Sequence, residues 1–327
     1  MKKIISVILS VLMLTSLLSG CGSSASTPNS DAELHVAIVQ QLDHSSLDEI
    51  REAVKAQLTA LAEAKGITIR IDEYNGQNDA SVLNQIGTEA VSDGVDMLIP
   101  IATTAAQCMI TAAEGTNIPI VYAAVSDPES TGLTGHANVT GTSDALNTAF
   151  ILDMMLSVQP DIQTVGLLYS NSEPNSITPI AQAKEYLDAK GIAYLEKTGT
   201  TAGEVIAAAA SLVDRVDAVF TPTDNAIMAA EASVAETLNQ AGIPHYTGAD
   251  SFVLSGAFAT CGVNYTELGT KTADIAFDIL MGGEIPEFHV MDGGIITVNT
   301  ETAAQIGLDY SAFAEMANTV NEVVTGE

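Results

Sequence analysis

The stretch LHVAIVQQLDHSSLDEIREAVKAQLTALAEAKG, residues 34–66, decides the fold of this chain. Its first seven residues form a nearly continuous apolar run, which predicts a strand buried on both faces of a parallel sheet. Apolar side chains then recur at helical spacing, at Leu47, Ile50, Val54, Leu58 and Leu61. Ser45 or Ser46 can cap the start of this helix, and Gly66 ends it. The stretch therefore predicts one strand–helix unit.

The same unit repeats along the rest of the chain. Strands are predicted at residues 67–74, 95–102, 118–125, 164–170, 192–197, 216–221, 243–248 and 294–298, with a further apolar run at 256–263. Helices are predicted at residues 80–92, 105–114, 145–158, 176–190, 202–214, 226–241 and 266–281. This alternation predicts an α/β fold of doubly wound parallel sheets. Because so many strands exceed one such sheet and the series restarts near residues 142–144, we expect two similar lobes joined by a hinge.

The N-terminus has the features of a secretory signal. Lys2 and Lys3 precede an apolar run at residues 4–18, which is too short to span a membrane and is followed by no stop-transfer pattern. The ending Leu18-Ser-Gly-Cys21 resembles the lipobox of bacterial lipoproteins, in which Cys21 is lipidated, for example with palmitate, and becomes the mature N-terminus. The alternative is an ordinary signal that releases the protein into solution. Residues 22–32 are predicted to be a flexible polar linker after the signal peptide 1–21.

Composition restricts the possible partners. The chain is 47% apolar and 16% charged, so about 300 mature residues can bury a substantial core. Loss of Lys2 and Lys3 changes the formal net charge from −30 to −32, which disfavours binding to nucleic acid and to anionic lipid headgroups. Cys108 and Cys261 lie in apolar or Ala/Thr-rich contexts, where buried free thiols are expected, and the five histidines show no metal-ligand spacing. We expect no metal and no cofactor.

The common catalytic motifs are missing from the sequence. The turn after the first strand, at residues 40–45, has no glycine, so a dinucleotide could not approach the backbone there. No phosphate-binding loop and no Gly-x-Ser-x-Gly nucleophile motif is present. Asp43 and His44 with a serine could be imagined as a hydrolase site, but neighbouring residues in sequence rarely orient each other. We therefore expect a binding protein and not an enzyme.

Six polar segments lie at the expected ends of the strands. They lie at residues 101–107, 123–128, 139–144, 169–176, 221–225 and 248–250. Each alone is explained by helix capping, since Ser, Thr, Asp and Asn are favoured at helix N-termini. In parallel sheets, however, ligands bind outside the carboxyl ends of the strands, and two facing lobes would place these loops around one cleft. No lysine or arginine lies in them, so a zwitterionic amino acid fits better than a multiply charged anion.

Several short motifs in the sequence resemble those of a known protein family. They include Asp43-His44-x-x-Leu47-Asp48, Ala124-Val125-Ser126-Asp127-Pro128, Asn138-Val-Thr-Gly-Thr-Ser-Asp144, Glu173-x-Asn175-Ser176 and Pro222-x-Asp224-Asn225. As a set, extending from the lipobox to about residue 308, they resemble the ABC-transporter substrate-binding lipoproteins of the tryptophan/tyrosine-type group, which have the type I periplasmic-binding-protein fold. Ser45 and Thr104 depart from this pattern, because the family usually has proline at the first position and commonly at the second.

The resemblance implies the capture of an amino acid, often aromatic, by closure of two lobes, and its delivery to an ABC permease with a separate ATPase. It implies an extracytoplasmic protein held on a bacterial membrane by its lipid. The alternative is a ligand sensor that presents its closed state to a chemoreceptor or kinase. The expected lobes are residues 33–143 plus 265–284, and residues 144–264 plus 285–327.

Site residues follow from the loops and the resemblance together. The candidate ligand-binding residues are Gln40, Thr103, Thr104, Ala124, Ser126, Asp127, Ser143, Asp144, Tyr169, Asn171, Glu173, Asn175, Asp224, Asn225 and Asp250. We expect groups near Thr103, Ser126 and Ser143 to receive the ligand carboxylate. Asp224 or Asp250 is expected to receive the ammonium, unless Asp224 only caps the helix after it. Tyr122 and Tyr169 are the candidate walls of the side-chain pocket.

Overall fold

The first strand–helix unit forms where its pattern predicts it. The computed structural model describes residues 33–326, so the signal peptide, Cys21 and the predicted linker lie outside the described residues. Strand β1 (Leu34–Gln40) is followed by helix α2 (Ser45–Lys65). Helix α2 buries the apolar side that its period predicts, and it ends where Gly66 adopts φ 68°, a conformation that costs glycine little. The amide of Gly66 then caps the helix by bonding the carbonyl of Glu63.

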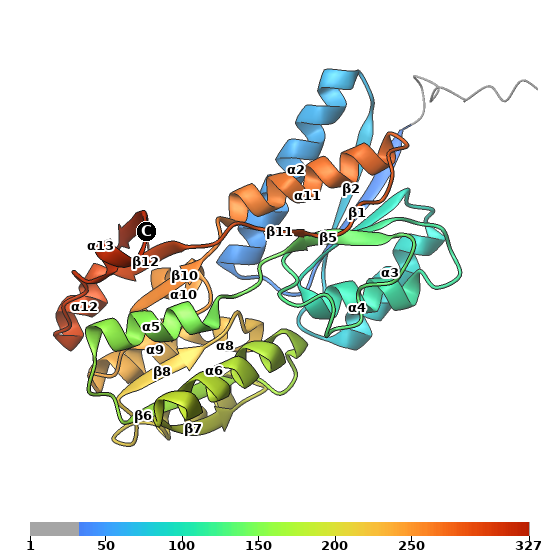
Figure 1. The fold of residues 1–327 in the computed structure, drawn as a ribbon. Coiled ribbons are helices and arrows are strands. Elements are labelled where there is room, and N and C mark those ends of the chain that lie inside the picture. Colours follow the sequence, from blue (N-terminus) through green and yellow to red (C-terminus); the bar gives the residue numbers. More distant parts are fainter. Residues whose placement is uncertain (1–32, 327) are drawn as a thin grey trace, which may run out of the picture. The chain divides into compact units, whose positions relative to one another are not determined.

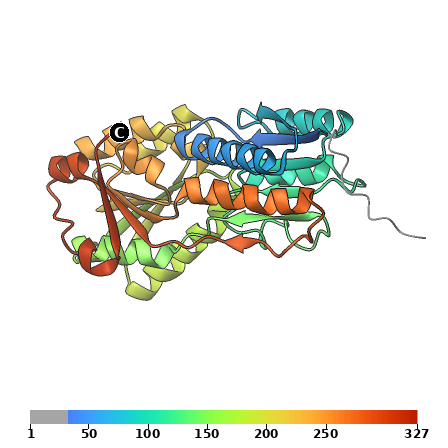
Figure 2. The same ribbon diagram turned by 90° about the horizontal axis from the view of Figure 1, so that it is seen from above.

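The N-terminal lobe is a parallel sheet covered by helices on both faces. The strand order is β11-β5-β4-β3-β1-β2, and all its pairings are parallel. Its other strands are β2 (Ile69–Asn75), β3 (Met97–Ile101), β4 (Ile120–Tyr122), β5 (Val139–Ser143) and β11 (His289–Val290). Its other helices are α3 (Ala80–Ser92), α4 (Thr103–Ala112) and α11 (Tyr265–Leu280). Helices α3 and α4 pack on one face, whereas α2 and α11 lie side by side on the other (Figure 2).

The C-terminal lobe repeats this architecture with two reversed strands at one edge of the sheet. Its strand order is β13-β12-β10-β9-β8-β6-β7, in which β12 pairs antiparallel with β10 and parallel with β13. The strands are β6 (Thr164–Tyr169), β7 (Ala193–Thr198), β8 (Ala218–Thr221), β9 (His245–Thr247), β10 (Ala259–Gly262), β12 (Ile295–Asn299) and β13 (Thr319–Val323). The helices are α5 (Thr148–Val158), η1 (Pro174–Ser176), α6 (Ile177–Lys190), α7 (Ala202–Ala210), α8 (Asn225–Met228), α9 (Glu231–Gln240), α10 (Asp250–Leu254), α12 (Thr300–Ile306) and α13 (Phe313–Met316).

Three chain crossings connect the lobes. They run from β5 to α5, from β10 to α11 and from β11 to β12 (Figure 1). The predicted fold class, two parallel-sheet α/β lobes, is confirmed. Several elements were not expected: β5, β11, α10, α12, α13 and β13 have no separate prediction, and the helix predicted at 226–241 is divided into α8 and α9. Residues 139–143, predicted as part of a polar loop, are the strand β5, and only Asp144 of that segment follows the strand.

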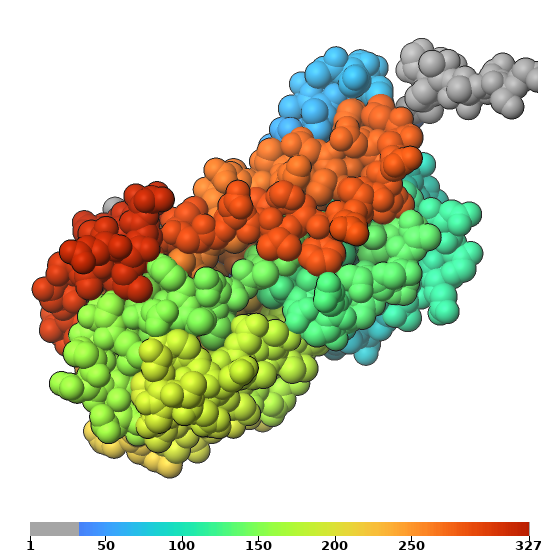
Figure 3. All heavy atoms as spheres, viewed as in Figure 1, coloured from blue at the N-terminus to red at the C-terminus, as the bar shows by residue number. Residues whose placement is uncertain are grey.

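The structure differs from the expected lobe boundary after residue 284. Strand β11 pairs with β5 of the N-terminal sheet, in the register His289 opposite Thr142 and Val290 opposite Ser143. In the space-filling view, the orange residues that follow α11 lie beside the green residues around β5 (Figure 3). The third crossing therefore follows Val290. A two-residue strand has no sequence period that could reveal it, because its position depends on pairing with a strand about 150 residues earlier.

Candidate ligand-binding cleft

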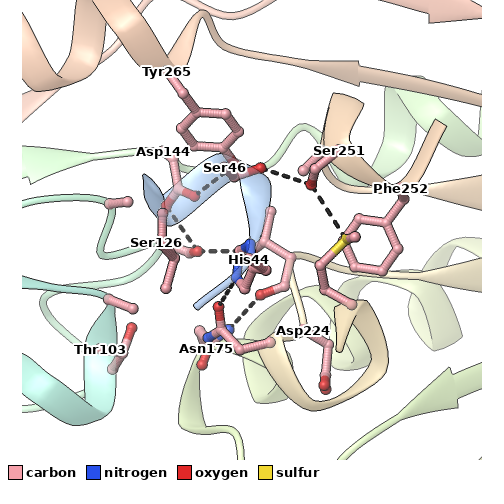
Figure 4. A pocket seen from close by; sticks show the side chains of 17 residues that line it. His44, Ser46, Thr103, Ser126, Asp144, Asn175, Asp224, Ser251, Phe252 and Tyr265 are labelled. Atoms are coloured by element: carbon pink, nitrogen blue, oxygen red, sulfur yellow. Dashed lines mark hydrogen bonds between the residues drawn. The ribbon is translucent and has the colours of Figure 1, made fainter. Parts of the chain in front are cut away.

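A cleft lies between the two lobes at the carboxyl ends of their parallel strands (Figure 4). About 370 Å³ inside it is free of protein atoms, counting its open mouth. The lining residues are His44, Ser46, Leu47, Ala102, Thr103, Ala124, Ser126, Asp144, Asn175, Thr223, Asp224, Asn225, Met228, Ala249, Ser251, Phe252 and Tyr265.

Two strained alanines follow the central strands of the N-terminal lobe. Ala102, after β3, has φ 77° and ψ 163°, and Ala124, after β4, has φ 54°. Non-glycine residues rarely adopt positive φ, and such strain concentrates at functional sites. Ala102 turns the chain into α4, whose first residue is Thr103. The hydroxyl of Thr103 is buried and has no hydrogen-bond partner, so the strained turn presents an unused polar group at a helix N-terminus.

Asp144 forms the hinge side of the cleft. It lies directly after β5, and only 6% of its surface is exposed. Its Oδ1 accepts a hydrogen bond from the Ser126 hydroxyl at 2.9 Å, and its Oδ2 accepts one from the Tyr265 hydroxyl at 3.3 Å. Burial raises the pKa of this carboxyl, because no cation compensates the lost hydration. Asp144 is thus a buried acid held only by hydroxyl groups, which can turn toward another partner.

His44 presents an unused ring nitrogen to the cleft. Its Nε2 lies 3.0 Å from the amide oxygen of Asn225, and the amide nitrogen of Asn225 donates to Glu173 at 2.8 Å. The amide oxygen of Asn225 can only accept, so His44 carries its proton on Nε2. Burial lowers the pKa of His44 and favours the neutral ring. Its buried Nδ1 is then an acceptor, and it has no hydrogen-bond partner among residues 33–326.

Glu173 lies behind this histidine and connects the two lobes. Its other oxygen accepts a hydrogen bond from the Gln41 amide at 3.0 Å, and Gln41 in turn accepts one from the amide of Thr104 at 3.2 Å. Burial, with the nearby carboxylate of Asp224, raises the pKa of Glu173 to about 8. The two amide donors oppose this shift because they favour the charged form.

Both carboxylate oxygens of Asp224 accept hydrogen bonds from groups of its own lobe. Its Oδ2 accepts hydrogen bonds from the amide of Ser170 and the hydroxyl of Ser176, both at 2.7 Å. Its Oδ1 accepts one from the amide of Ile227 at 3.0 Å and so caps α8. Burial raises the pKa of Asp224 to about 6. The capping role that the sequence suggested for this residue is therefore present in the structure.

One end of the cleft is apolar except for two serines. Leu47, Met228, Ala249 and Phe252 line this end, and all four are buried. Ser46 donates a hydrogen bond to Ser251 at 2.6 Å. Figure 4 shows Ser251 beside Phe252 and Ser46 between Ser251 and Tyr265, on the side of the cleft away from Thr103.

Hydrogen bonds cross directly from lobe to lobe. They join Gln41 to Glu173, His44 to Asn225, Ser46 to Ser251, Ser126 to Thr223 at 3.0 Å and Asp127 to Thr178 at 2.7 Å. Because side chains of the two lobes bond each other directly, the lobes have a closed arrangement.

The structure brings about half of the candidate residues together. The cleft is lined by the predicted residues Thr103, Ala124, Ser126, Asp144, Asn175, Asp224 and Asn225. Thr104 and Glu173 support this lining through Gln41. These residues were found because they follow the carboxyl ends of strands.

The other candidates lie elsewhere. Gln40 is buried, and its side-chain amide donates a hydrogen bond to Asp48. Ser143 and Asp127 line a separate groove near Thr178. Asp250 lines a small cavity on another side of its loop.

Neither candidate wall is among the residues that line the cleft. Tyr169 bonds Glu196 on the exposed side of β6, near Asn171, which bonds Thr198. Tyr122 is packed in the core so tightly against Gly141 that a Cβ there would lie 2.1 Å from the Tyr122 carbonyl. Side chains alternate between the two faces of a strand, so a shift of one residue decides whether a tyrosine faces the ligand or points away from it.

The sequence prediction missed several lining residues. They include His44, Ser46, Leu47, Thr223, Met228, Ser251, Phe252 and Tyr265. The strand-end rule could have found His44 and Ser46, which follow β1, and Ser251 and Phe252, which follow β9. Tyr265 starts α11, directly after a crossing between lobes, and no local sequence signal marks its role.

Comparisons with known proteins agree with this geometry. The family described as ABC transporter substrate binding protein matches residues 35–319. The chain is 33% identical, over 92% of its length and 91% of the relative's, to a tyrosine-binding protein of Clostridioides difficile. A Streptococcus pneumoniae ABC domain in complex with L-Trp is similar at 26% identity, with a TM-score of 0.82 over 88% of this chain and 100% of that one. The ligand-free, open structure of a Clostridium difficile substrate-binding protein with adhesive properties is 30% identical, with a TM-score of 0.67 over 89% and 99%.

The chain belongs to the ABC transporter substrate-binding proteins. It is an extracytoplasmic binding protein and not an enzyme, and its partners are a small-molecule ligand and an ABC permease. The predicted family and the non-enzymatic function are confirmed. Within residues 33–326, no helix has the length and hydrophobicity needed to cross a bilayer.

Proposed function

We propose that this protein captures an aromatic amino acid as a zwitterion and delivers it to an ABC permease for import. The observation that carries the proposal is the set of buried polar groups left without partners in the cleft. Thr103 offers a free hydroxyl, and His44 and Asn175 offer free acceptors. Asp144 and Asp224 line the cleft, and no lysine or arginine is among the described residues that line it. A ligand with an ammonium and only one carboxylate satisfies this combination.

Asp144 is the best candidate for the ammonium. Asp224 already accepts three hydrogen bonds that hold its own lobe together, and Asp250 is not among the lining residues. Asp144 has only the hydroxyls of Ser126 and Tyr265, and its burial leaves it without a countercharge. An ammonium beside it would supply that charge.

The turn after β3 is the best candidate for the carboxylate. The positive end of the α4 dipole, the free hydroxyl of Thr103 and the strained backbone at Ala102 meet there. Ser126 can contribute by rotating its hydroxyl, which now bonds Asp144 and Thr223. Ser143 is a weaker candidate, because its hydroxyl donates to the Ser126 carbonyl away from the cleft.

An aromatic side chain fits the apolar end of the cleft. Phe252 and Met228 offer surfaces that favour aromatic rings. The printed names of two relatives, one tyrosine-binding and one in complex with L-Trp, support the same ligand class. The TM-score is higher against the L-Trp complex, at 0.82, than against the open, ligand-free structure, at 0.67, although the latter has the higher sequence identity. This difference in shape supports a closed state that the ligand stabilises.

A lipid at Cys21 would hold the protein on the membrane near its permease. The motif Leu18-Ser-Gly-Cys21 supports this proposal. Two or more acyl chains are needed for stable anchoring, since one chain binds only reversibly. Cys21→Ser should abolish fatty-acid labelling and leave the protein uncleaved or released, whereas labelling that persists would contradict the proposal.

Thermal unfolding with each of the twenty amino acids, and with nucleosides and sugars, tests the ligand class. At 100 times its dissociation constant, a ligand should stabilise the folded state by about 2.7 kcal/mol. We expect this stabilisation from aromatic amino acids and not from D-ribose or adenosine. Stabilisation only by a sugar or a nucleoside would overturn the proposed function.

A further inference from the structure

The two serines at the apolar end of the cleft are unusual for a pocket that takes only a hydrocarbon side chain. Ser46 and Ser251 are 3% and 2% exposed, and they share this part of the cleft lining with Leu47, Met228, Phe252 and Tyr265. Burying a hydroxyl has a free-energy cost unless it finds a good partner. Alanine would fill the same positions without this cost, so the hydroxyls call for an explanation.

The hydroxyls of Ser46 and Ser251 can form more or better hydrogen bonds than those in the structure. The hydroxyl of Ser46 donates to Ser251, and that of Ser251 donates to the sulfur of Met228 at 3.3 Å. A thioether is a weak acceptor, so the Ser251 donor has a poor partner. No hydrogen bond is donated to Ser46 by the described residues, although a hydroxyl oxygen can accept two. The pair can therefore accept one hydrogen bond and donate another to an incoming hydroxyl group.

The direction of the cleft places this pair at the far end of the bound amino acid. Figure 4 shows Thr103 and Ser251 on opposite sides of the cleft, with Ser126 and His44 between them in that view. A ligand whose carboxylate lies at Thr103 points its side chain toward Phe252 and the serines. The para position of an aromatic ring is then the part nearest to the two hydroxyls.

We propose that Ser46 and Ser251 form a hydroxyl-recognition pair that selects a para-hydroxylated aromatic side chain, so that L-tyrosine binds more tightly than L-phenylalanine. This inference rests on the proposed function, since it concerns the same cleft. The phenol donates to Ser46, and Ser251 turns from the Met228 sulfur to donate to the phenol oxygen. Because Ser46 belongs to α2 of one lobe and Ser251 to α10 of the other, the phenol also joins the lobes.

The expected selectivity is moderate. In a site whose polar groups would be left unpaired, loss of the ligand hydroxyl can cost about 10⁴-fold or more. Here the two serines bond each other when no hydroxyl arrives, so the phenylalanine complex keeps one hydrogen bond. We expect a preference for tyrosine of about tenfold, the gain from one net hydrogen bond.

Calorimetric titration with L-tyrosine and L-phenylalanine tests the inference on the wild type, Ser46→Ala and Ser251→Ala. We expect either substitution to weaken tyrosine binding about tenfold and to leave phenylalanine binding within about twofold, so that the preference disappears. Ser157→Ala is the matched control, because the Ser157 hydroxyl bonds the Met154 carbonyl of its own helix, far from the cleft lining. It should keep the wild-type preference. The ratio of the two affinities also corrects for any general loss of folded protein.

The titrations distinguish a failure of this inference from a failure of the proposed function. A wild type that binds both amino acids equally, or serine variants that keep the preference, would overturn the inference and leave the proposed function intact. A wild type that binds neither these two amino acids nor L-tryptophan would overturn the proposed function and the inference together.

Discussion

Asparagine substitutions at the two acids of the cleft separate ligand binding from fold stability. Asp144→Asn removes the charge that we assign to the ammonium while keeping the size of the side chain. Truncating one partner of a buried, hydrogen-bonded charge pair weakens binding by about 2–5 kcal/mol, or roughly 30-fold or more. The empty protein should melt within a few degrees of the wild type, because the Ser126 and Tyr265 hydroxyls can rotate to suit an amide.

Asp224→Asn should behave in the opposite way. Two backbone amides and one hydroxyl donate to this carboxylate, so the NH₂ group of asparagine must face at least one donor. Loss of these charge-assisted bonds and of the α8 cap should cost about 2–4 kcal/mol of stability. At roughly 2–4 °C per kcal/mol, the melting temperature should fall by about 4–16 °C.

Calorimetric titration with L-tyrosine and scanning calorimetry of the empty proteins measure the two effects. Asp250→Asn is the matched control and should keep near-native affinity, because Asp250 does not line the cleft. Near-native affinity of Asp144→Asn, with a large loss in Asp224→Asn at an unchanged melting temperature, would refute our assignment. The ammonium partner would then be Asp224, as the sequence first suggested.

Three other predictions concern the lobes. Folding raises the pKa of Glu173 from 4.5 to about 8, so between these pH values the folded protein binds a proton that the unfolded chain releases. The free energy of unfolding should therefore fall as pH rises from about 4.5 to 8. Melting curves should show this decline, and Glu173→Gln should flatten it; an unchanged slope would argue against a titrating Glu173. Gly269→Ala should destabilise the protein by about 1–3 kcal/mol in urea, since a Cβ there would lie 2.7 Å from the Ile50 carbonyl oxygen, whereas Gly203→Ala has open space and should be neutral or stabilising. Small-angle scattering should show compaction when L-tyrosine is added, and an unchanged profile at saturation would indicate a rigid pocket.

The sequence by itself determined the architecture. An apolar run followed by a 3.6-residue period, repeated along the chain, allows few structures other than helices packed on parallel sheets. It also predicted that the cleft forms at the carboxyl ends of the strands, because the polar loops lie there. These are local properties: the period of a helix and the end of a strand depend on residues near one another in the chain.

Tertiary structure decided which polar residues face the cleft. Asp144 and Asp224 look alike in sequence, since each follows a strand, yet only Asp224 is occupied by amides of its own lobe. Ser46 and Ser251 lie 205 residues apart in the chain, and their hydroxyls meet across the two lobes. Such pairings depend on strand register, on the three crossings and on closure, and none of these leaves a local pattern in the sequence.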